Sequence, residues 1–214
     1  MARTRAADHD QRRFTILMHA AEQFAKHGYD RASQAMIAKA AGVSKTLAYH
    51  YWPDKEAMLF EVLEHHLRRL VDIARIAPNL DMAPREQLES FARMLLEAYQ
   101  DADAVHRVQI ACLSLLSPER QATLKAMERE MVQAAAGIIA ELHPGTPEAL
   151  LKPLTMSFFA MLNWHYLWHR EGAALSREDY ATVVAAMIAS GTPGVTEAFR
   201  GRLKPRVRLP EDAR

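Results

Sequence analysis

The sequence predicts an all-α protein of about nine helices, and three features of its 214 residues point to that fold class. Apolar side chains recur at intervals of three and four, as from Leu59 to Leu70, which places them on one face of a helix. No stretch keeps the strict alternation of apolar and polar residues that a half-buried strand shows. Prolines precede the periodic segments, where the first helical turn tolerates them: Pro53, Pro84, Pro118 and Pro147.

The first four helices are expected at residues 8–27, 33–40, 44–51 and 54–76. The first has an apolar face that includes Phe24, and it ends before Gly28, which can adopt the left-handed conformation that closes a helix. Gly42 allows the turn between the second and third helices, and Ser44 is the expected N-cap of the third. Asp54 is the expected N-cap of the fourth, whose leucines share one face.

The remaining helices are expected at residues 84–101, 104–116, 118–142, 147–171 and 176–190. A proline begins the fifth, and Ser117, Thr146 and Ser176 are the expected N-caps of the last three. Pro153 lies inside the eighth helix, where it removes a backbone hydrogen bond, so we expect a kink or a broken start there. Residues 201–214 are expected to form a flexible basic tail.

The composition is that of an ordinary folded protein, with 50% hydrophobic and 25% charged residues. Cys112 is the single cysteine, which excludes an intramolecular disulfide and a CxxC site, and its apolar neighbours favour a buried thiol over a redox sensor. No apolar run is long enough for a membrane span and the N-terminus lacks a signal-peptide pattern. We therefore expect neither a membrane span nor a signal peptide, and we expect a cytoplasmic location.

Charge is distributed unevenly along the chain. Residues 1–60 carry nine basic and six acidic side chains, residues 61–200 carry 13 and 18, and residues 201–214 carry five and two, so the net charges are +3, −5 and +3. A basic segment ahead of an acidic body favours attraction of a polyanion at one end of the protein. A solvated surface without a partner would show the same pattern, so charge alone leaves both interpretations open.

The segment from Ser33 to Met58, SQAMIAKAAGVSKTLAYHYWPDKEAM, predicts two short helices that share one buried face. Tyr49 and Tyr51 cannot both face the core of the second short helix, so one of them must be exposed. Four arginines precede this segment within the first 13 residues. A short helix with such neighbours can enter the major groove of DNA, which is about 12 Å wide.

From Phe14 to His65 the sequence resembles the TetR family of one-component bacterial transcriptional regulators. The resemblance is carried by AAEQFAKHGYDRAS and IAKAAGVSKTLAYHYWPDKEAM, which combine a helix, an AGVS turn, an aromatic exit and a D-K-E cap. It implies a three-helix DNA-binding domain, a larger helical domain that binds an effector, and a homodimer formed mainly by the last two long helices. We expect the domains at residues 1–53 and 54–200, with helix 54–76 as the connector.

Double-stranded DNA is the expected partner of the first domain. Lys55 stands at a helix N-terminus, where backbone N–H groups also favour an anion, and is an expected phosphate contact. The sequence departs from the family pattern in two places, because Ala32 and Ser33 stand where a threonine pair is frequent and Ala48 replaces a larger aliphatic residue. The expected DNA contacts are Ser33, Gln34, Ser44, Lys45, Thr46, Tyr49, His50 and Lys55.

The eighth helix carries aromatic residues and methionines on every side between Phe158 and His169, so it must be covered on more than one side. Core packing with a dimer contact would explain this, and an effector pocket is the other interpretation, because pockets are largely apolar with a few orienting polar groups. The expected lining favours a mainly apolar effector: Met94, Tyr99, His106, Ile110, Met127, Met161, Asn163, Trp164, His165 and Trp168. Residues 163–180 also resemble family members that answer acyl thioesters or other hydrophobic metabolites.

Two clusters of titratable residues could form a functional site, but for both we prefer a structural explanation. His165 and His169 have the spacing of zinc ligands on a helix, but no third ligand can be named, so we expect no metal. The fourth helix carries a second cluster that is expected to form a solvated face or an interdomain contact: Glu61, Glu64, His65 and His66.

The expected dimer interface lies on the ninth helix, at Tyr180, Val183, Val184, Met187 and Ile188. We expect neither an enzyme nor a cofactor, because no GxSxG elbow, phosphate-binding glycine loop or dinucleotide fingerprint occurs. The alternative is a helical adaptor or enzyme that has kept the bundle without DNA binding. Exposure of Lys45, Thr46, Tyr49 and His50 together would argue against this alternative, since neither an adaptor nor an enzyme requires such a basic and aromatic face.

Overall fold

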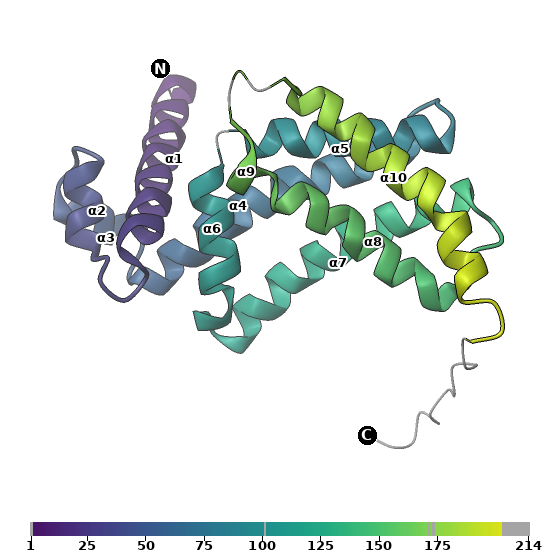
Figure 1. Ribbon diagram of the computed structural model, residues 1–214. Coiled ribbons are helices and arrows are strands. Elements are labelled where there is room, and N and C mark those ends of the chain that lie inside the picture. The colour runs from purple at the N-terminus through teal and green to yellow at the C-terminus, as the bar shows by residue number, and fades with distance from the viewer. Residues whose placement is uncertain (1, 101, 171, 173, 203–214) are drawn as a thin grey trace. The chain divides into compact units, whose positions relative to one another are not determined.

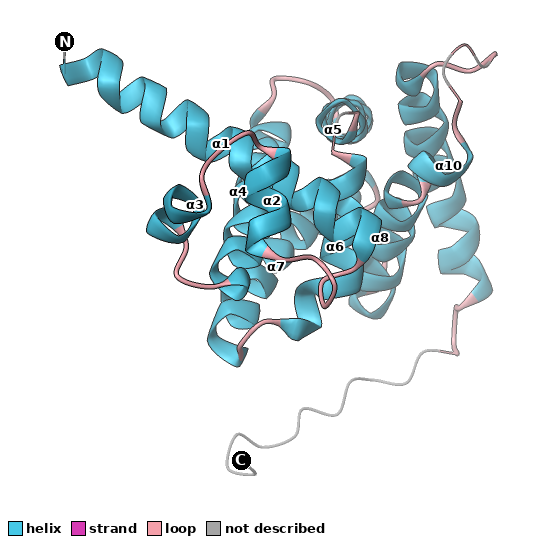
Figure 2. Cartoon of the chain, turned by 90° about the vertical axis from the view of Figure 1, so that its left-hand side faces the viewer, coloured by secondary structure: helices cyan, strands magenta, loops and turns pink. Residues whose placement is uncertain are grey.

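The computed structural model describes residues 2–100, 102–170, 172 and 174–202, and these residues form helices, turns and loops but no strand (Figure 2). The expected all-α fold class is therefore confirmed. The expected basic tail lies outside the described residues from position 203 onward. Within the described part of the chain, no helix has the length and apolar character needed to cross a membrane.

Figure 1 shows the order of the helices along the chain. They are α1 (Ala2–His27), α2 (Gln34–Ala40), α3 (Lys45–Tyr51), α4 (Lys55–Ile76), α5 (Pro84–Tyr99), α6 (Asp103–Cys112), α7 (Pro118–Leu142), α8 (Glu148–Asn163), α9 (His165–Trp168) and α10 (Arg177–Ala198), with short 3-10 turns η1 (Ala77–Asn79) and η2 (Leu113–Leu115). The bounds of α2 to α5 lie within two residues of those expected from sequence, and the bounds of α7 agree at both ends.

Two expectations about the last helices were wrong. The expected eighth helix is two helices, because α8 continues through Pro153 and ends at Asn163, and the four-residue α9 follows Trp164. The ninth was expected to end at residue 190, but α10 continues through Pro193 to Ala198. Within that extension the side chain of Thr192 is fully buried and its hydroxyl donates to the carbonyl of Ile188 at 2.7 Å. Tertiary packing therefore outweighs the local helix-breaking signal.

Three of the expected N-caps are confirmed by hydrogen bonds from backbone N–H groups. Ser44 Oγ accepts from Leu47, Asp54 Oδ1 from Ala57 and Ser176 Oγ from Asp179, at 3.1, 2.6 and 3.0 Å. The expectation for Thr146 was wrong, because its hydroxyl is buried without a hydrogen-bond partner and Pro147 occupies the N-cap position of α8. A threonine before a proline is thus not by itself a sufficient capping signal.

Residues 1–72 and 98–129 form one compact unit, here called unit 1. In unit 1, α1 packs against α2 and α6, and α2 packs against α3. Because α2 and α3 have only seven residues each, they depend on this packing for their stability. The contacts bury large side chains from successive segments: Ile16, Phe24, Ile37, Trp52, Leu59 and Leu63.

The second compact unit, unit 2, comprises the described residues from 73 to 97 and from 130 to 202, without positions 171 and 173. Here α8 packs against α10. Phe91 of α5 contacts Phe158 and Phe159 of α8, with ring centroids 5.9 and 6.2 Å apart. A ring nitrogen of His143 also lies 2.7 Å from the carbonyl oxygen of Ala189. Unit 2 is thus held mainly by apolar and aromatic packing.

The chain passes from one unit to the other inside α4, near the end of α5 and inside α7. These boundaries do not coincide with the division at residues 53 and 54 that the sequence suggested. Helix α6 and the first half of α7 belong to the same compact unit as the three N-terminal helices, because α6 packs on α1.

Candidate DNA-binding face

Helix α3 presents an exposed polar and aromatic face. Lys45, Thr46, Tyr49 and His50 are all exposed, whereas Ala48 is fully buried on the opposite side. The small Ala48 side chain allows α3 to lie close to the helices beneath it. The ammonium of Lys45 lies 5.5 Å from the centroid of the Tyr49 ring, so the two side chains form one exposed cation–aromatic pair.

Of the two tyrosines near the end of α3, one is exposed and the other is partly covered, as the sequence predicted. Tyr49 is 44% exposed, whereas Tyr51 is partly covered and contacts the ring of His9 on α1 at 4.9 Å. Trp52 is 1% exposed and forms the C-cap of α3. Tyr49 is therefore the tyrosine that faces outward.

The two expected DNA contacts of α2 differ in accessibility. Ser33 is exposed, and its hydroxyl oxygen accepts from the backbone N–H of Met36 at 3.2 Å as the N-cap of α2. Gln34 is 5% exposed, and its side-chain amide donates to the carbonyl of Trp52 at 2.9 Å. A DNA contact by Gln34 stays a prediction, and it would require the side chain to leave its bond between α2 and the end of α3.

Lys55 is engaged within the protein. Its ammonium donates to the backbone carbonyls of Tyr29 and Asp30 at 2.6 and 3.2 Å and lies 4.2 Å from the centroid of the Tyr29 ring. These contacts hold the start of α4 against the segment that follows α1. Phosphate binding by Lys55 stays a prediction, and it would have to coexist with these bonds.

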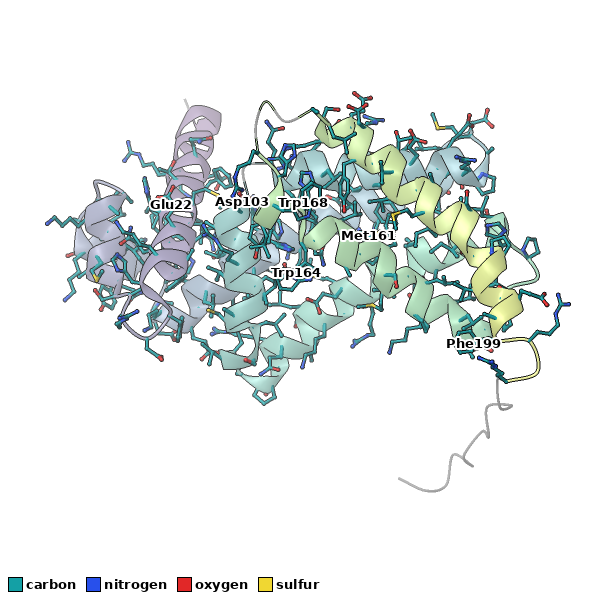
Figure 3. The ribbon with its side chains drawn as sticks, in the orientation of Figure 1. Glu22, Asp103, Met161, Trp164, Trp168 and Phe199 are labelled. Carbon is teal, nitrogen blue, oxygen red and sulfur yellow. The ribbon has the colours of Figure 1, made fainter. Side chains whose placement is uncertain are left out.

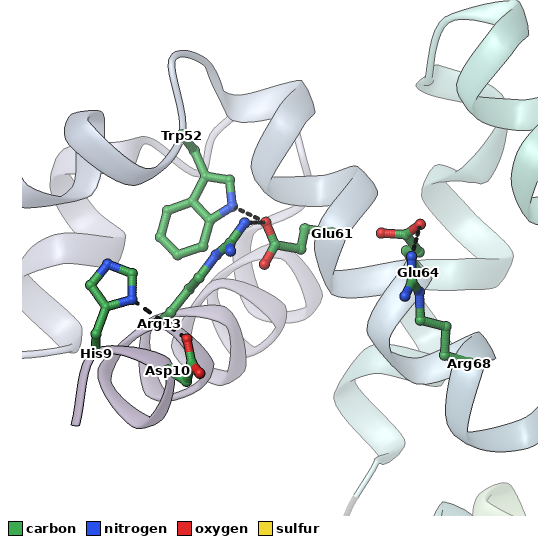
Figure 4. A network of polar contacts seen from close by, with 7 residues as sticks. All are labelled: His9, Asp10, Arg13, Trp52, Glu61, Glu64 and Arg68. Atoms are coloured by element: carbon green, nitrogen blue, oxygen red, sulfur yellow. Dashed lines mark hydrogen bonds and ion pairs between the residues drawn. The ribbon is translucent and has the colours of Figure 1, made fainter. Parts of the chain in front are cut away.

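Two carboxylates of α4, those of Glu61 (Figure 4) and Glu56, make connections that were not expected from sequence. Glu61 accepts hydrogen bonds from Arg13 of α1 and from the indole N–H of Trp52, at 2.6 and 2.7 Å. Glu56 accepts from the backbone N–H of Ser117 at 2.8 Å, and this bond is the main reason why its pKa is lowered. From the sequence, only a solvated face or an interdomain contact was predicted for the acidic cluster of α4. The actual partners were missed because sequence spacing does not show residues that are far apart along the chain.

The expected effector-binding residues divide between the two units. In unit 1, Tyr99 and His106 are buried with His66, and the ring centroids of Tyr99 and His106 are 5.0 Å apart. Burial, followed by the charge of His106, lowers the pKa of His66 to about 3, and burial raises the pKa of Tyr99. His66 and Tyr99 are therefore polar groups that stay uncharged at neutral pH. Ile110 is 55% exposed and Met127 is partly exposed.

In unit 2 most of the expected lining lies on α9 and the end of α8, where Figure 3 labels Met161, Trp164 and Trp168. His165 is 1% exposed, and its ring stacks on those of His169 and Tyr180 at 4.3 and 4.9 Å. Burial, followed by the charges of His169 and Arg177, lowers its pKa to about 4. Trp164 and Trp168 are about half-exposed, and the other expected lining residues are partly exposed: Met94, Met161 and Asn163.

The expected dimer residues of α10 do not share one exposed face. Val184 and Ile188 are 0% and 4% exposed within the chain itself, so neither is available to a second copy, and that part of the expectation was wrong. Val183 and Met187 are 37% and 59% exposed. Tyr180 is partly exposed and donates from its hydroxyl to the carbonyl of Met161 at 3.2 Å.

Two short helices joined at a glycine turn, the second with an exposed basic and aromatic face, define a helix-turn-helix protein. Residues 16–62 match the bacterial regulatory proteins of the tetR family, and residues 81–192 match the tetracyclin repressor-like C-terminal domain. The chain belongs to the TetR family of transcriptional regulators, as the resemblance in its N-terminal segment indicated.

Individual relatives agree with this assignment. The chain is 32% identical over 146 residues to the HTH-type transcriptional regulator RutR of Escherichia coli K12, and the aligned region covers 64% of this chain and 66% of RutR. A TetR-family regulator from Bordetella parapertussis has a similar structure, with a TM-score of 0.77, 29% identity, and coverage of 85% of this chain and 96% of that one. AibR, solved with isovaleryl coenzyme A and operator DNA, shares the fold at a TM-score of 0.70 and 21% identity, over 82% of this chain and 97% of that one.

Proposed function

We propose that the protein is a cytoplasmic, ligand-responsive repressor that binds a palindromic operator as a homodimer and is released by a mainly apolar small molecule. The observation that carries the proposal is the outward face of α3, where Lys45, Thr46, Tyr49 and His50 are all exposed. A helix of this size fits the major groove, and a lysine beside a tyrosine can contact both phosphates and base edges.

The operator is expected to be an inverted repeat, because a symmetric dimer carries two identical recognition helices. Half-site centres should be separated by about one helical turn, about 34 Å, or a modest multiple of it. The exposed Val183 and Met187 of α10 support a self-complementary interface in unit 2, together with Tyr180 at its edge.

A mainly apolar effector is supported by the character of the expected lining. In unit 2, aromatic rings predominate around α9, and in unit 1 the expected lining residues Tyr99 and His106 are buried with their ring centroids 5.0 Å apart. AibR, which has the same fold, was solved with an acyl coenzyme A. An acyl thioester or a related hydrophobic metabolite is therefore the effector class that we propose.

Fluorescence anisotropy tests DNA binding directly. Overlapping labelled duplexes of about 40 base pairs that tile the region upstream of the gene would present several half-site spacings to the purified protein. We expect one duplex to bind far more tightly than a scrambled duplex, with an affinity that falls steeply as salt increases. Equal affinity for every duplex, or no binding at about 50 mM salt, would contradict the proposal.

Effector binding is tested with the tryptophans of unit 2. Acyl coenzyme A esters of increasing chain length would be titrated against the protein, first alone and then bound to the selected duplex. A ligand near α9 should change the fluorescence of Trp164 and Trp168 and should release the duplex in a graded manner, because coupling between two sites is typically about 1 to 3 kcal/mol. Strong fluorescence changes without any change in operator affinity would contradict the coupling.

A further inference from the structure

One oxygen of Glu61 joins three elements of unit 1. Oε2 accepts from Nη2 of Arg13 on α1 at 2.6 Å and from Nε1 of Trp52 at 2.7 Å. The Arg13 guanidinium also lies 5.8 Å from the centroid of the Trp52 ring. Because an ionised carboxylate makes stronger hydrogen bonds than a neutral acceptor, both bonds are of the kind that fixes an orientation.

Trp52 is where this carboxylate connects to the recognition helix. Its backbone N–H donates to Ala48 at 3.0 Å and closes α3, while its carbonyl accepts from the buried side chain of Gln34. The indole ring is 1% exposed, so it cannot turn away without opening the core. Trp52 therefore connects the Glu61 carboxylate, through its ring, to the C-terminus of α3, through its backbone.

We infer that Glu61 is a positioning residue for DNA recognition, which holds the indole of Trp52 and thereby sets the angle at which the outward face of α3 meets the groove. The inference deepens the proposed function and rests on it, since it concerns the orientation of the same DNA-binding face. Glu61 acts through Trp52 and Arg13 rather than by touching DNA.

This role predicts that removal of the Glu61 carboxylate reduces the selectivity of DNA binding more than its strength. Phosphate contacts tolerate a modest rotation of a helix, whereas hydrogen bonds to base edges require their donors and acceptors in register. Removal of the Glu61 carboxylate should therefore reduce the preference for the operator over other duplexes more than it reduces the affinity for a scrambled duplex. A carboxylate that only stabilised the fold would lower the melting temperature and leave that preference unchanged.

Glu64 provides a matched control on the same helix (Figure 4). The side chains of Glu61 and Glu64 are 22% and 21% exposed, and both line the same surface hollow of about 510 Å³. Each also pairs with an arginine. The partner of Glu64 is Arg68 on its own helix, at 2.8 Å, so this pair connects α4 to no other element.

The first experiment compares Glu61→Ala, Glu61→Gln and Glu64→Ala by anisotropy and by thermal unfolding. For Glu61→Ala we expect the ratio of operator to scrambled-duplex affinity to fall by about tenfold, the size of a charge-assisted hydrogen bond. Glu61→Gln should restore part of the ratio, because the amide oxygen can still accept from the indole N–H. Glu64→Ala should change the ratio by less than about twofold, because its partner Arg68 lies on the same helix and the pair orients no other element.

The second experiment observes the indole directly. The chain contains three tryptophans, and the half-exposed Trp164 and Trp168 can each be replaced by Phe to assign their indole ¹H–¹⁵N resonances. The remaining resonance belongs to Trp52. We expect it to shift in Glu61→Ala and to keep its position in Glu64→Ala.

The outcomes separate the inference from the proposed function. A wild-type protein that binds no duplex would overturn both. A wild-type protein that selects the operator, together with an unshifted Trp52 indole in Glu61→Ala or equal changes in the affinity ratio for Glu61→Ala and Glu64→Ala, would overturn the inference alone. A shifted indole and a reduced ratio in Glu61→Ala only, at a temperature where all variants are folded, would support it.

Discussion

The two compact units use different interactions to hold their helices. In unit 1, side chains from the first turns of α4 form polar bonds to α1, to the end of α3 and to the segment before α7. In unit 2, α5, α8 and α10 contact one another mainly through aromatic and aliphatic side chains. Unit 2 also carries ten of the 15 exposed large hydrophobic side chains in the described part of the chain.

This difference matches two different requirements. Hydrogen bonds and ion pairs are directional, so they fix the orientation of short helices that read DNA. Apolar packing is not directional. Covering exposed apolar side chains with another molecule stabilises the complex that forms. Unit 1 is therefore expected to fail through loss of orientation, and unit 2 through exposure or mispacking of apolar surface.

The largest expected effect concerns adjacent faces of α10. Val184→Asp places a carboxylate where the side chain is 0% exposed and should lower the free energy of unfolding by about 4 kcal/mol or more. Met187→Asp places the same group where the side chain is 59% exposed, so the fold should remain and the dimer should dissociate. Thermal unfolding and light scattering distinguish these results. A folded Val184→Asp protein, or an unchanged dimer for Met187→Asp, would contradict the assignment of the two faces.

The second comparison concerns two lysines of unit 1. Lys45 is exposed on α3, so Lys45→Ala should weaken operator binding by about tenfold and leave the melting temperature unchanged. Lys55→Ala removes the donor to the carbonyls of Tyr29 and Asp30, and it should lower the free energy of unfolding by about 1 to 2 kcal/mol. Anisotropy at several salt concentrations and chemical denaturation measure the two effects. Unchanged stability of Lys55→Ala would show that its internal bonds contribute little.

The sequence was sufficient for the all-α class, for the bounds of α2 to α5 and of α7, and for the exposed face of α3, because these depend on local spacing. It was not sufficient to separate Val183 from Val184, which are equally apolar and differ only in the side of α10 on which they lie. Nor did it reveal the bond between Arg13 and Glu61, whose residues are 48 positions apart. Partners of polar side chains are set by tertiary packing, which local periodicity does not encode.

A smaller effect is expected from His66 as pH falls. Its pKa is lowered to about 3 by burial, whereas an unfolded histidine has a pKa of about 6.5, so between these values only the unfolded chain takes up the proton. The contribution of buried, uncharged His66 to the free energy of unfolding is complete above pH 6.5. It decreases as pH falls, and about 2 kcal/mol of it is lost at pH 5. His66→Gln should therefore flatten the dependence of the free energy of unfolding on pH between about 6.5 and 5. His27→Gln, at a partly exposed position of α1, is the control, and equal slopes for wild type and His66→Gln would contradict the prediction.

The smallest effects come from two hydroxyl residues that the sequence treats alike. Both Thr146 and Ser176 precede a helix of unit 2, but Ser176 forms a reciprocal pair of hydrogen bonds with Asp179, whereas the side-chain hydroxyl of Thr146 is buried without a hydrogen-bond partner. Ser176→Ala should lower the free energy of unfolding by about 1 kcal/mol, the usual contribution of an N-cap. Thr146→Val keeps the shape of the side chain and removes an unsatisfied hydroxyl, so stability should stay the same or rise by up to about 1 kcal/mol. Denaturant titration of both variants measures the difference, and a loss of stability in Thr146→Val as large as that in Ser176→Ala would show that the Thr146 hydroxyl does form a stabilising hydrogen bond.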